Sequence, residues 1–155
     1  MMIMPPKSSI IARAVRKIFK DNGTRFPSND KTTNEKAIAG VTSGMMKLHD
    51  TVTWQATHFG ITFYMTSAIP VLQEPNYFVS QMIKGPFKKL YHQHLFEEKN
   101  NQTIMTDIFE FEAPYGMLGK VVEKLVLTNH MKTFLVMRNA YLKAIAESED
   151  WKKYL

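Results

Sequence analysis

The chain contains no cysteine, and its 155 residues include only seven glycines and seven prolines. Without cysteine, disulfides, thiol nucleophiles, iron–sulfur clusters and cysteine-ligated zinc are excluded. No apolar run approaches the roughly 18 residues that a membrane-spanning helix needs. Arg13, Arg16 and Lys17 interrupt the one apolar stretch near the start, which disfavours a signal peptide. These absences predict a cytoplasmic protein without a transmembrane segment.

The remaining composition is typical of one globular domain. Hydrophobic residues make up 45% of the chain and charged residues 22%. A chain of this length buries roughly 70% of its unfolded surface, so its core needs no metal or covalent link for stability. No catalytic or cofactor-binding motif stands out, and we expect no cofactor.

Positive charge is concentrated at the start of the chain. Residues 1–37 carry eight basic and three acidic side chains, a net charge of +5, whereas residues 38–155 carry only +1. Residues 8–20 have helical spacing of apolar side chains, and a polar loop follows. Because no aromatic platform or reading helix accompanies the charge, we expect no nucleic-acid partner. A regulatory module that presents this segment to an acidic partner or membrane surface remains an alternative.

The middle of the chain has the alternation of apolar and polar residues that is typical of strands. Six strands are predicted over residues 37–42, 51–58, 61–71, 77–83, 87–97 and 103–112. Phe59-Gly60 and the segment around Asn100-Asn101 are short enough for hairpins, which predicts an antiparallel meander.

Beyond Pro114 the apolar residues recur at helical spacing, in a stripe that includes Arg138, as far as about residue 147. Such a stripe needs an apolar surface to lie against, and the sheet is the one available. We therefore predict an α+β domain, in which a curved antiparallel sheet of about six strands wraps around one long C-terminal helix. Trp151 and Tyr154 lie beyond this helix. They either pack against the domain or mediate self-association, so a homo-oligomer is possible.

Eight sequence segments resemble the START-like, or SRPBCC, superfamily. They are NEKAIAGVTSG (34–44), TVTW (51–54), HFG (58–60), KGPF (84–87), HQHLF (92–96), TIMTD (103–107), FEFEAP (109–114) and GMLG (116–119). The nearest resemblance is to uncharacterised bacterial polyketide cyclase/dehydrase-like proteins. It implies a helix-grip fold with a cavity between sheet and helix, but no particular chemistry, because the superfamily includes carriers, receptors and cyclases.

The resemblance divides the chain into a basic N-terminal helix and loop (1–33), a START-like domain (34–150) and a C-terminal tail (151–155). The start departs from the pattern of the superfamily, because only residues 1–4 can supply its first strand. A shortened first strand would leave part of a sheet edge uncovered.

His92 and His94 are two residues apart on a predicted strand, so they point to the same face. A two-residue hairpin loop pairs position 94 with Asp107, and a four-residue loop pairs position 92 with it. Either loop places Asp107 on the histidine face.

Three hypotheses follow for these residues. The favoured one is a structural ion pair between histidine and aspartate across the strands. A metal site would need a third ligand such as His58 or Glu110, and alternation turns Glu110 to the opposite face, so no metal is predicted. The third hypothesis is a cyclase- or dehydratase-type enzyme, with His92, His94 and Asp107 as its acid–base residues.

Large apolar side chains on the predicted elements could form either a packed core or the lining of a ligand cavity. Those on the strands are Trp54, Phe63, Met65, Phe78, Met82, Met105, Phe109 and Phe111, and those on the helix are Met117, Leu118, Leu125 and Met131. The main prediction is a protein, not an enzyme, that binds a hydrophobic small molecule or lipid between the sheet and the C-terminal helix.

Overall fold

The structure is a computed structural model that describes residues 2–4, 36–42, 45–58, 61–114, 116 and 127–148. The predicted helix over residues 8–20, the loop that follows it, most of the first part of the long helix and the C-terminal tail lie outside these residues.

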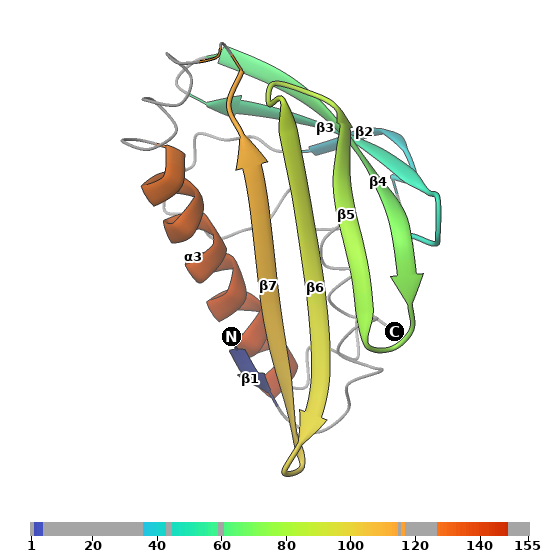
Figure 1. Cartoon of the computed structure of the whole chain (residues 1–155), viewed down its shortest axis with the longest axis vertical. Helices are drawn as coiled ribbons and strands as arrows, with labels where there is room; N and C mark the ends of the chain where they lie inside the picture. The colour runs from blue at the N-terminus through green and yellow to red at the C-terminus, as the bar shows by residue number, and fades with distance from the viewer. Residues whose placement is uncertain are drawn as a thin grey trace.

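A single antiparallel sheet of seven strands dominates the described part of the chain (Figure 1). Its strands are β1 (Met2–Met4), β2 (Lys36–Gly40), β3 (Thr51–His58), β4 (Ile61–Gln73), β5 (Tyr77–Lys84), β6 (Lys89–Lys99) and β7 (Gln102–Glu112). Their order across the sheet is β1-β7-β6-β5-β4-β3-β2, so the last six form the predicted meander.

The β6–β7 hairpin has a two-residue turn whose sequence suits its backbone conformation. Asn100 and Asn101 connect the two strands, with φ angles of 53° and 58°. Lys99 pairs with Gln102, so the loop has two residues. Two consecutive positive φ angles are the requirement of a type I′ turn, and asparagine tolerates them better than most residues.

The strand predicted over residues 37–42 ends earlier than expected. β2 stops at Gly40, whose φ of 75° takes the chain out of the extended conformation. A Cβ atom at this position would lie 2.2 Å from the carbonyl oxygen of Thr51, so the neighbouring strand also requires glycine here.

β1 is as short as the sequence indicated, with three residues, and it pairs with β7 from Met2 opposite Met105 to Met4 opposite Thr103. Among the described residues, β1 therefore pairs with only the first part of the outer edge of β7.

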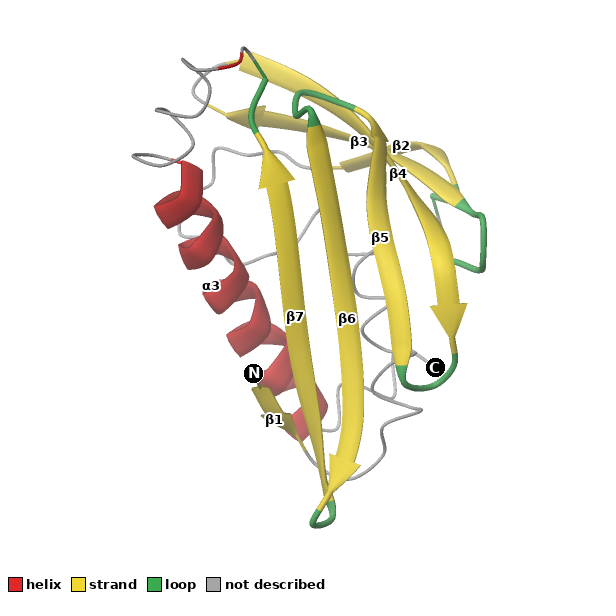
Figure 2. Ribbon diagram, viewed as in Figure 1, coloured by secondary structure: helices red, strands yellow, loops and turns green. Residues whose placement is uncertain are grey.

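In the described part of the chain, one helix, α3 (Thr128–Glu147), lies alongside the sheet, next to β7 (Figure 2). Its buried residues are Arg138, Leu142, Ile145 and Ala146, which recur at the spacing of one helix face. Leu142 and Ile145 join Trp54, Phe78 and Met105 of the sheet in one core cluster. The predicted packing of the C-terminal helix on the sheet is confirmed for the part that the structure describes. No described helix is long and apolar enough to cross a membrane.

Candidate functional site

Five polar side chains meet where α3 crosses the sheet. His92 and His94 come from β6, Asp107 comes from β7, and Arg138 and Asn139 come from α3. His94 is directly opposite Asp107, and His92 is opposite Phe109, so the two-residue hairpin sets the register. The prediction that Asp107 shares a face with both histidines is confirmed, and we call these five residues the polar cluster.

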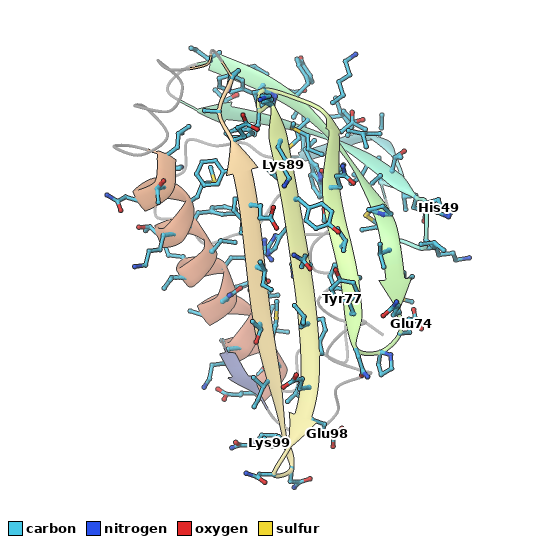
Figure 3. The ribbon with its side chains drawn as sticks, in the orientation of Figure 1. His49, Glu74, Tyr77, Lys89, Glu98 and Lys99 are labelled. Atoms are coloured by element: carbon cyan, nitrogen blue, oxygen red, sulfur yellow. The ribbon has the colours of Figure 1, made fainter. Side chains whose placement is uncertain are left out.

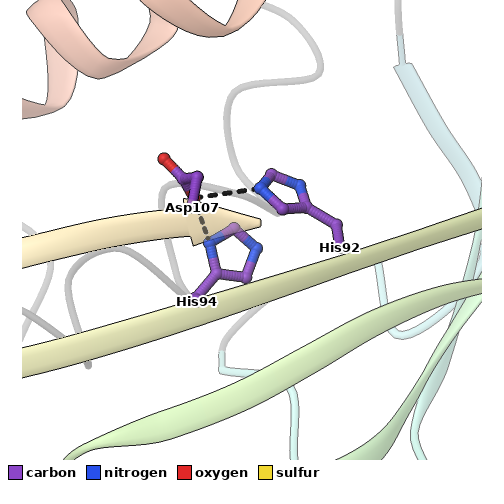
Figure 4. A group of neighbouring side chains, drawn as sticks. All are labelled: His92, His94 and Asp107. Atoms are coloured by element: carbon purple, nitrogen blue, oxygen red, sulfur yellow. Dashed lines mark hydrogen bonds and ion pairs between the residues drawn. The ribbon is translucent and has the colours of Figure 1, made fainter. Parts of the chain in front are cut away.

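Asp107 is the centre of the polar cluster (Figure 4). Its Oδ1 atom lies 2.9 Å from Nε2 of His92 and 2.8 Å from Nδ1 of His94. Its Oδ2 atom accepts a hydrogen bond of 2.6 Å from Nδ2 of Asn139. Nη2 of Arg138 lies 4.0 Å from Oδ1. One carboxylate therefore links two strands and the helix.

Burial determines the charge state of the histidines. Both rings are almost completely inaccessible to solvent. Burial lowers the pKa of His92 to about 4, and the nearby charge of Arg138 also lowers it, although the hydrogen bond to Asp107 acts in the opposite direction. Burial, together with the neighbouring His92, lowers the pKa of His94 well below its ordinary value. Both imidazoles are consequently neutral at pH 7.

The carboxyl group of Asp107 remains ionised at neutral pH. Burial alone would raise its pKa, but the hydrogen bonds from His92 and His94 and the charge of Arg138 outweigh this effect and lower it. Because the imidazoles are neutral, the ring nitrogen that faces the carboxylate carries the proton in each of them. This requires the Nε2–H tautomer of His92 and the Nδ1–H tautomer of His94.

Aromatic rings enclose the histidines on the same face of the sheet. The ring of Phe78 stacks on His94 at a centroid distance of 4.3 Å, and Phe109 meets His92 edge to face at 5.0 Å. The two imidazoles are 3.9 Å apart. The polar cluster thus lies in apolar surroundings, in which its hydrogen bonds are electrostatically stronger than they would be in water.

The predicted lining residues fall into three groups. Trp54, Phe78 and Met105 are buried in the core cluster. Phe63, Met65, Met82, Phe109, Phe111 and Met131 are only partly buried. Met117, Leu118 and Leu125 lie outside the described residues. The strand residues of the first two groups all lie on the face of the sheet that carries the histidines, as the pairing of neighbouring strands shows.

The opposite face of the sheet has a different chemistry (Figure 3). There the hydroxyl of Tyr77 donates to Oε1 of Gln93 at 2.9 Å, and Nζ of Lys89 donates to Oε2 of Glu110 at 2.6 Å. The Lys89–Glu110 pair is exposed to solvent. Glu110 therefore lies away from the polar cluster, as strand alternation predicted.

The donor atoms of His92, His94 and Asp107 all lie within 4.8 Å of one another, close enough to hold a metal ion after small adjustments. Glu110 is not available as a further ligand, and the side chain of His58 lies outside the described residues. Arg138 already places a positive charge near the carboxylate. A second cation in this buried position would meet electrostatic repulsion, which disfavours a metal.

Sequence reasoning identified three of the five residues and missed the contributions of Arg138 and Asn139. Arg138 did leave a signal, because it is a charged residue within an apolar helical stripe, where a partner on the facing surface is required. Asn139 left none, since asparagine is common on exposed helix positions.

The overall architecture has counterparts among solved structures. The protein TTHA0849 from Thermus thermophilus is 12% identical, with 94% of this chain and 95% of that protein covered and a TM-score of 0.64. Ara h 8.0201 is 14% identical, with 90% and 92% covered and a TM-score of 0.58. Ms6760 from Mycobacterium smegmatis is 14% identical, with 91% and 88% covered and a TM-score of 0.53. No family model matches the chain, and no curated protein sequence matches it significantly.

The chain has the START-like, helix-grip fold. The fold predicted from the eight sequence segments is therefore confirmed. At these low identities the likeness extends to the fold alone, and the START-like architecture accommodates several unrelated activities. What this chain does has to be argued from its own site.

Proposed function

We propose that the chain binds a hydrophobic small molecule or lipid between the concave face of the sheet and the C-terminal helix. The observation that carries this proposal is the composition of that face. Phenylalanine and methionine side chains from four neighbouring strands surround a small polar centre, and several of them are only partly buried. Sites for small apolar ligands have this composition, with a mainly apolar lining and a few polar groups that orient the ligand.

The experiment has two stages. Native mass spectrometry of the purified protein, followed by analysis of an organic extract, should reveal a bound apolar compound of defined mass. Titration with fatty alcohols, fatty acids and polycyclic aromatics, followed by displacement of a fluorescent probe, should then give saturable binding. A protein without bound material, together with no saturable binding of any of these compounds, would contradict the proposal.

A second candidate function is a cyclase- or dehydratase-type reaction, and the geometry of Asp107 favours it. A carboxylate that fixes the tautomer and orientation of an imidazole is a common way to prepare a general base. Here one carboxylate does this for two imidazoles. Incubation with a linear poly-β-ketone thioester mimic should give a cyclised aromatic product. The double variant His92→Gln/His94→Gln should lose this activity, and His49→Gln, at an exposed position on a loop, is the matched control.

Two further predictions concern parts of the chain outside the described residues. The basic segment could serve a regulatory module that binds an acidic partner, in which case the binding should weaken as salt rises. The C-terminal tail could mediate self-association, which sedimentation of the full chain would detect.

A further inference from the structure

We infer that the ligand is an electrically neutral molecule with a hydroxyl group that reaches the polar cluster, and not a fatty acid or an amine. This inference rests on the proposed function. It concerns the chemistry of the ligand's polar end and is argued from the charges and hydrogen bonds of the polar cluster.

The charges of the cluster are balanced without a ligand. Among the described residues, one carboxylate (Asp107) faces one guanidinium (Arg138), and their side chains are each only 7% exposed. The two histidines add no charge, because burial favours their neutral form. The cluster is therefore neutral as a whole at pH 7.

A charged ligand would disturb this balance in a place where water cannot compensate. A carboxylate group would bring a second negative charge close to Asp107. It could be balanced by protonation of an imidazole, but burial and the charge of Arg138 both oppose that. An ammonium group would instead approach Arg138. Burial of an unbalanced charge is among the costliest changes in a protein interior, so the cluster selects against both classes of ligand.

The hydrogen bonds of Asn139 specify what a neutral ligand should carry. Its Nδ2 atom donates to Asp107, so the orientation of the amide is determined by the carboxylate. Its Oδ1 atom is buried and has no hydrogen-bond partner among the residues that the structure describes. A buried acceptor of this kind is stabilised by a donor from the ligand, and a hydroxyl is the neutral group that donates one hydrogen bond most simply.

This arrangement should give measurable discrimination. A ligand that leaves Oδ1 without a donor loses one hydrogen bond in a site from which water is excluded. Losses of this kind correspond to about tenfold or more in affinity. The hydroxyl compound should therefore bind at least about tenfold more tightly than the methyl ether with the same skeleton, which accepts but does not donate.

Two matched series of probes test this inference. The first compares 1-dodecanol with dodecyl methyl ether, dodecanoate and dodecylamine, and the second compares 2-naphthol with 2-methoxynaphthalene and 2-naphthoate, all at pH 7. The hydroxyl compound should bind best in whichever series binds. If a carboxylate or ammonium compound binds as tightly as the alcohol, or if the ether equals the alcohol, the inference is wrong, although hydrophobic binding itself would stand.

Variants then locate the effect at the cluster. Asn139→Leu should remove the preference for alcohol over ether while the affinity for the ether changes little. Asn129→Leu, at an exposed position in the first turn of the same helix, should retain the preference. The comparison of probes on the unmodified protein is decisive even if Asn139→Leu does not fold.

Failure of the proposed function would look different. If neither series binds, the compound extracted from the native protein decides the matter. A neutral hydroxyl compound there supports the inference, and a charged one overturns it. If nothing is extracted either, the proposed function fails, and the inference fails with it.

Discussion

His94 lies directly opposite Asp107 in the β6–β7 pair, and its Nδ1 atom is 2.8 Å from Oδ1 of the carboxylate. The same oxygen is 2.9 Å from Nε2 of His92, which lies two residues earlier on the same strand. Asp107 therefore holds two rings through opposite ring nitrogens, and removal of its charge should affect both.

Replacement of Asp107 by asparagine should destabilise the protein strongly. The variant removes the negative charge that faces the buried guanidinium of Arg138, and the loss of one partner of a buried ion pair typically costs about 3–5 kcal/mol. Urea unfolding followed by circular dichroism measures the change. The control Glu110→Gln removes a carboxylate from the exposed face of the same strand and should alter the unfolding midpoint very little. Equal effects of the two variants would contradict the structure.

Stability should decrease as the pH falls from about 6.5 to 4. The pKa of His92 is about 4 in the folded protein and ordinarily 6.5, so below pH 6.5 the unfolded chain binds a proton that the native protein does not. At pH 4 this effect of His92 alone lowers the free energy of unfolding by about 3 kcal/mol relative to its value at pH 7. His94 acts in the same direction. Above pH 6.5 these two groups give no pH dependence.

Urea midpoints measured between pH 8 and 4 test this dependence. The double variant His92→Gln/His94→Gln should have a flatter profile over that range than the unmodified protein. A profile with the same slope in both proteins would show that other groups cause the acid sensitivity.

The two buried histidines should be in opposite tautomeric states. His92 donates from Nε2 and His94 from Nδ1, because these atoms face Asp107. Long-range ¹⁵N–¹H correlation spectra at pH 7 distinguish the two forms for each ring. The Nε2–H form in both rings would mean that His94 does not donate to the carboxylate.

Removal of the ring of Phe78 should cost about 3–5 kcal/mol of stability. This side chain is 2% exposed, packs in the core cluster and stacks on His94, so Phe78→Ala leaves a cavity beside the imidazole. Ile83→Ala on the same strand is the control, since Ile83 is 59% exposed and its truncation should change stability much less.

A β-branched residue at position 101 should strain the hairpin. Asn101 has a φ of 58°, and valine in this region costs roughly 1–2 kcal/mol. Asn101→Val should therefore lower the thermal midpoint, whereas Gln102→Val at the neighbouring strand position should not. Asn101→Gly should be tolerated, because glycine adopts positive φ without strain.

Much of this architecture could be predicted from the sequence because periodicity and turn residues are local signals. The alternation of apolar residues is enough to place His92, His94 and Asp107 on one face. Which histidine faces Asp107 directly could not be predicted, because that depends on whether the hairpin loop has two or four residues. The paired φ angles of Asn100 and Asn101 decide it.

The helix residues of the site were harder to foresee for a different reason. The sequence predicted the helix and its buried stripe, but the point at which a helix crosses a sheet depends on side-chain packing between segments far apart in the chain. Asn139 is 32 residues from Asp107, and nothing local associates the two. The predicted cavity depends on the same packing, and its helix side also involves residues outside the described part of the chain.

The bonds from α3 to Asp107 also have a mechanical consequence. An apolar helix face can slide along an apolar sheet with little change in energy, because each apolar contact that is lost is replaced by a similar one. A shift of one turn, about 5.4 Å, would take both Asn139 and Arg138 out of reach of the carboxylate. The polar cluster therefore acts as a pin that fixes the axial position of the helix, much as a single buried asparagine fixes the alignment of two strands in a coiled coil.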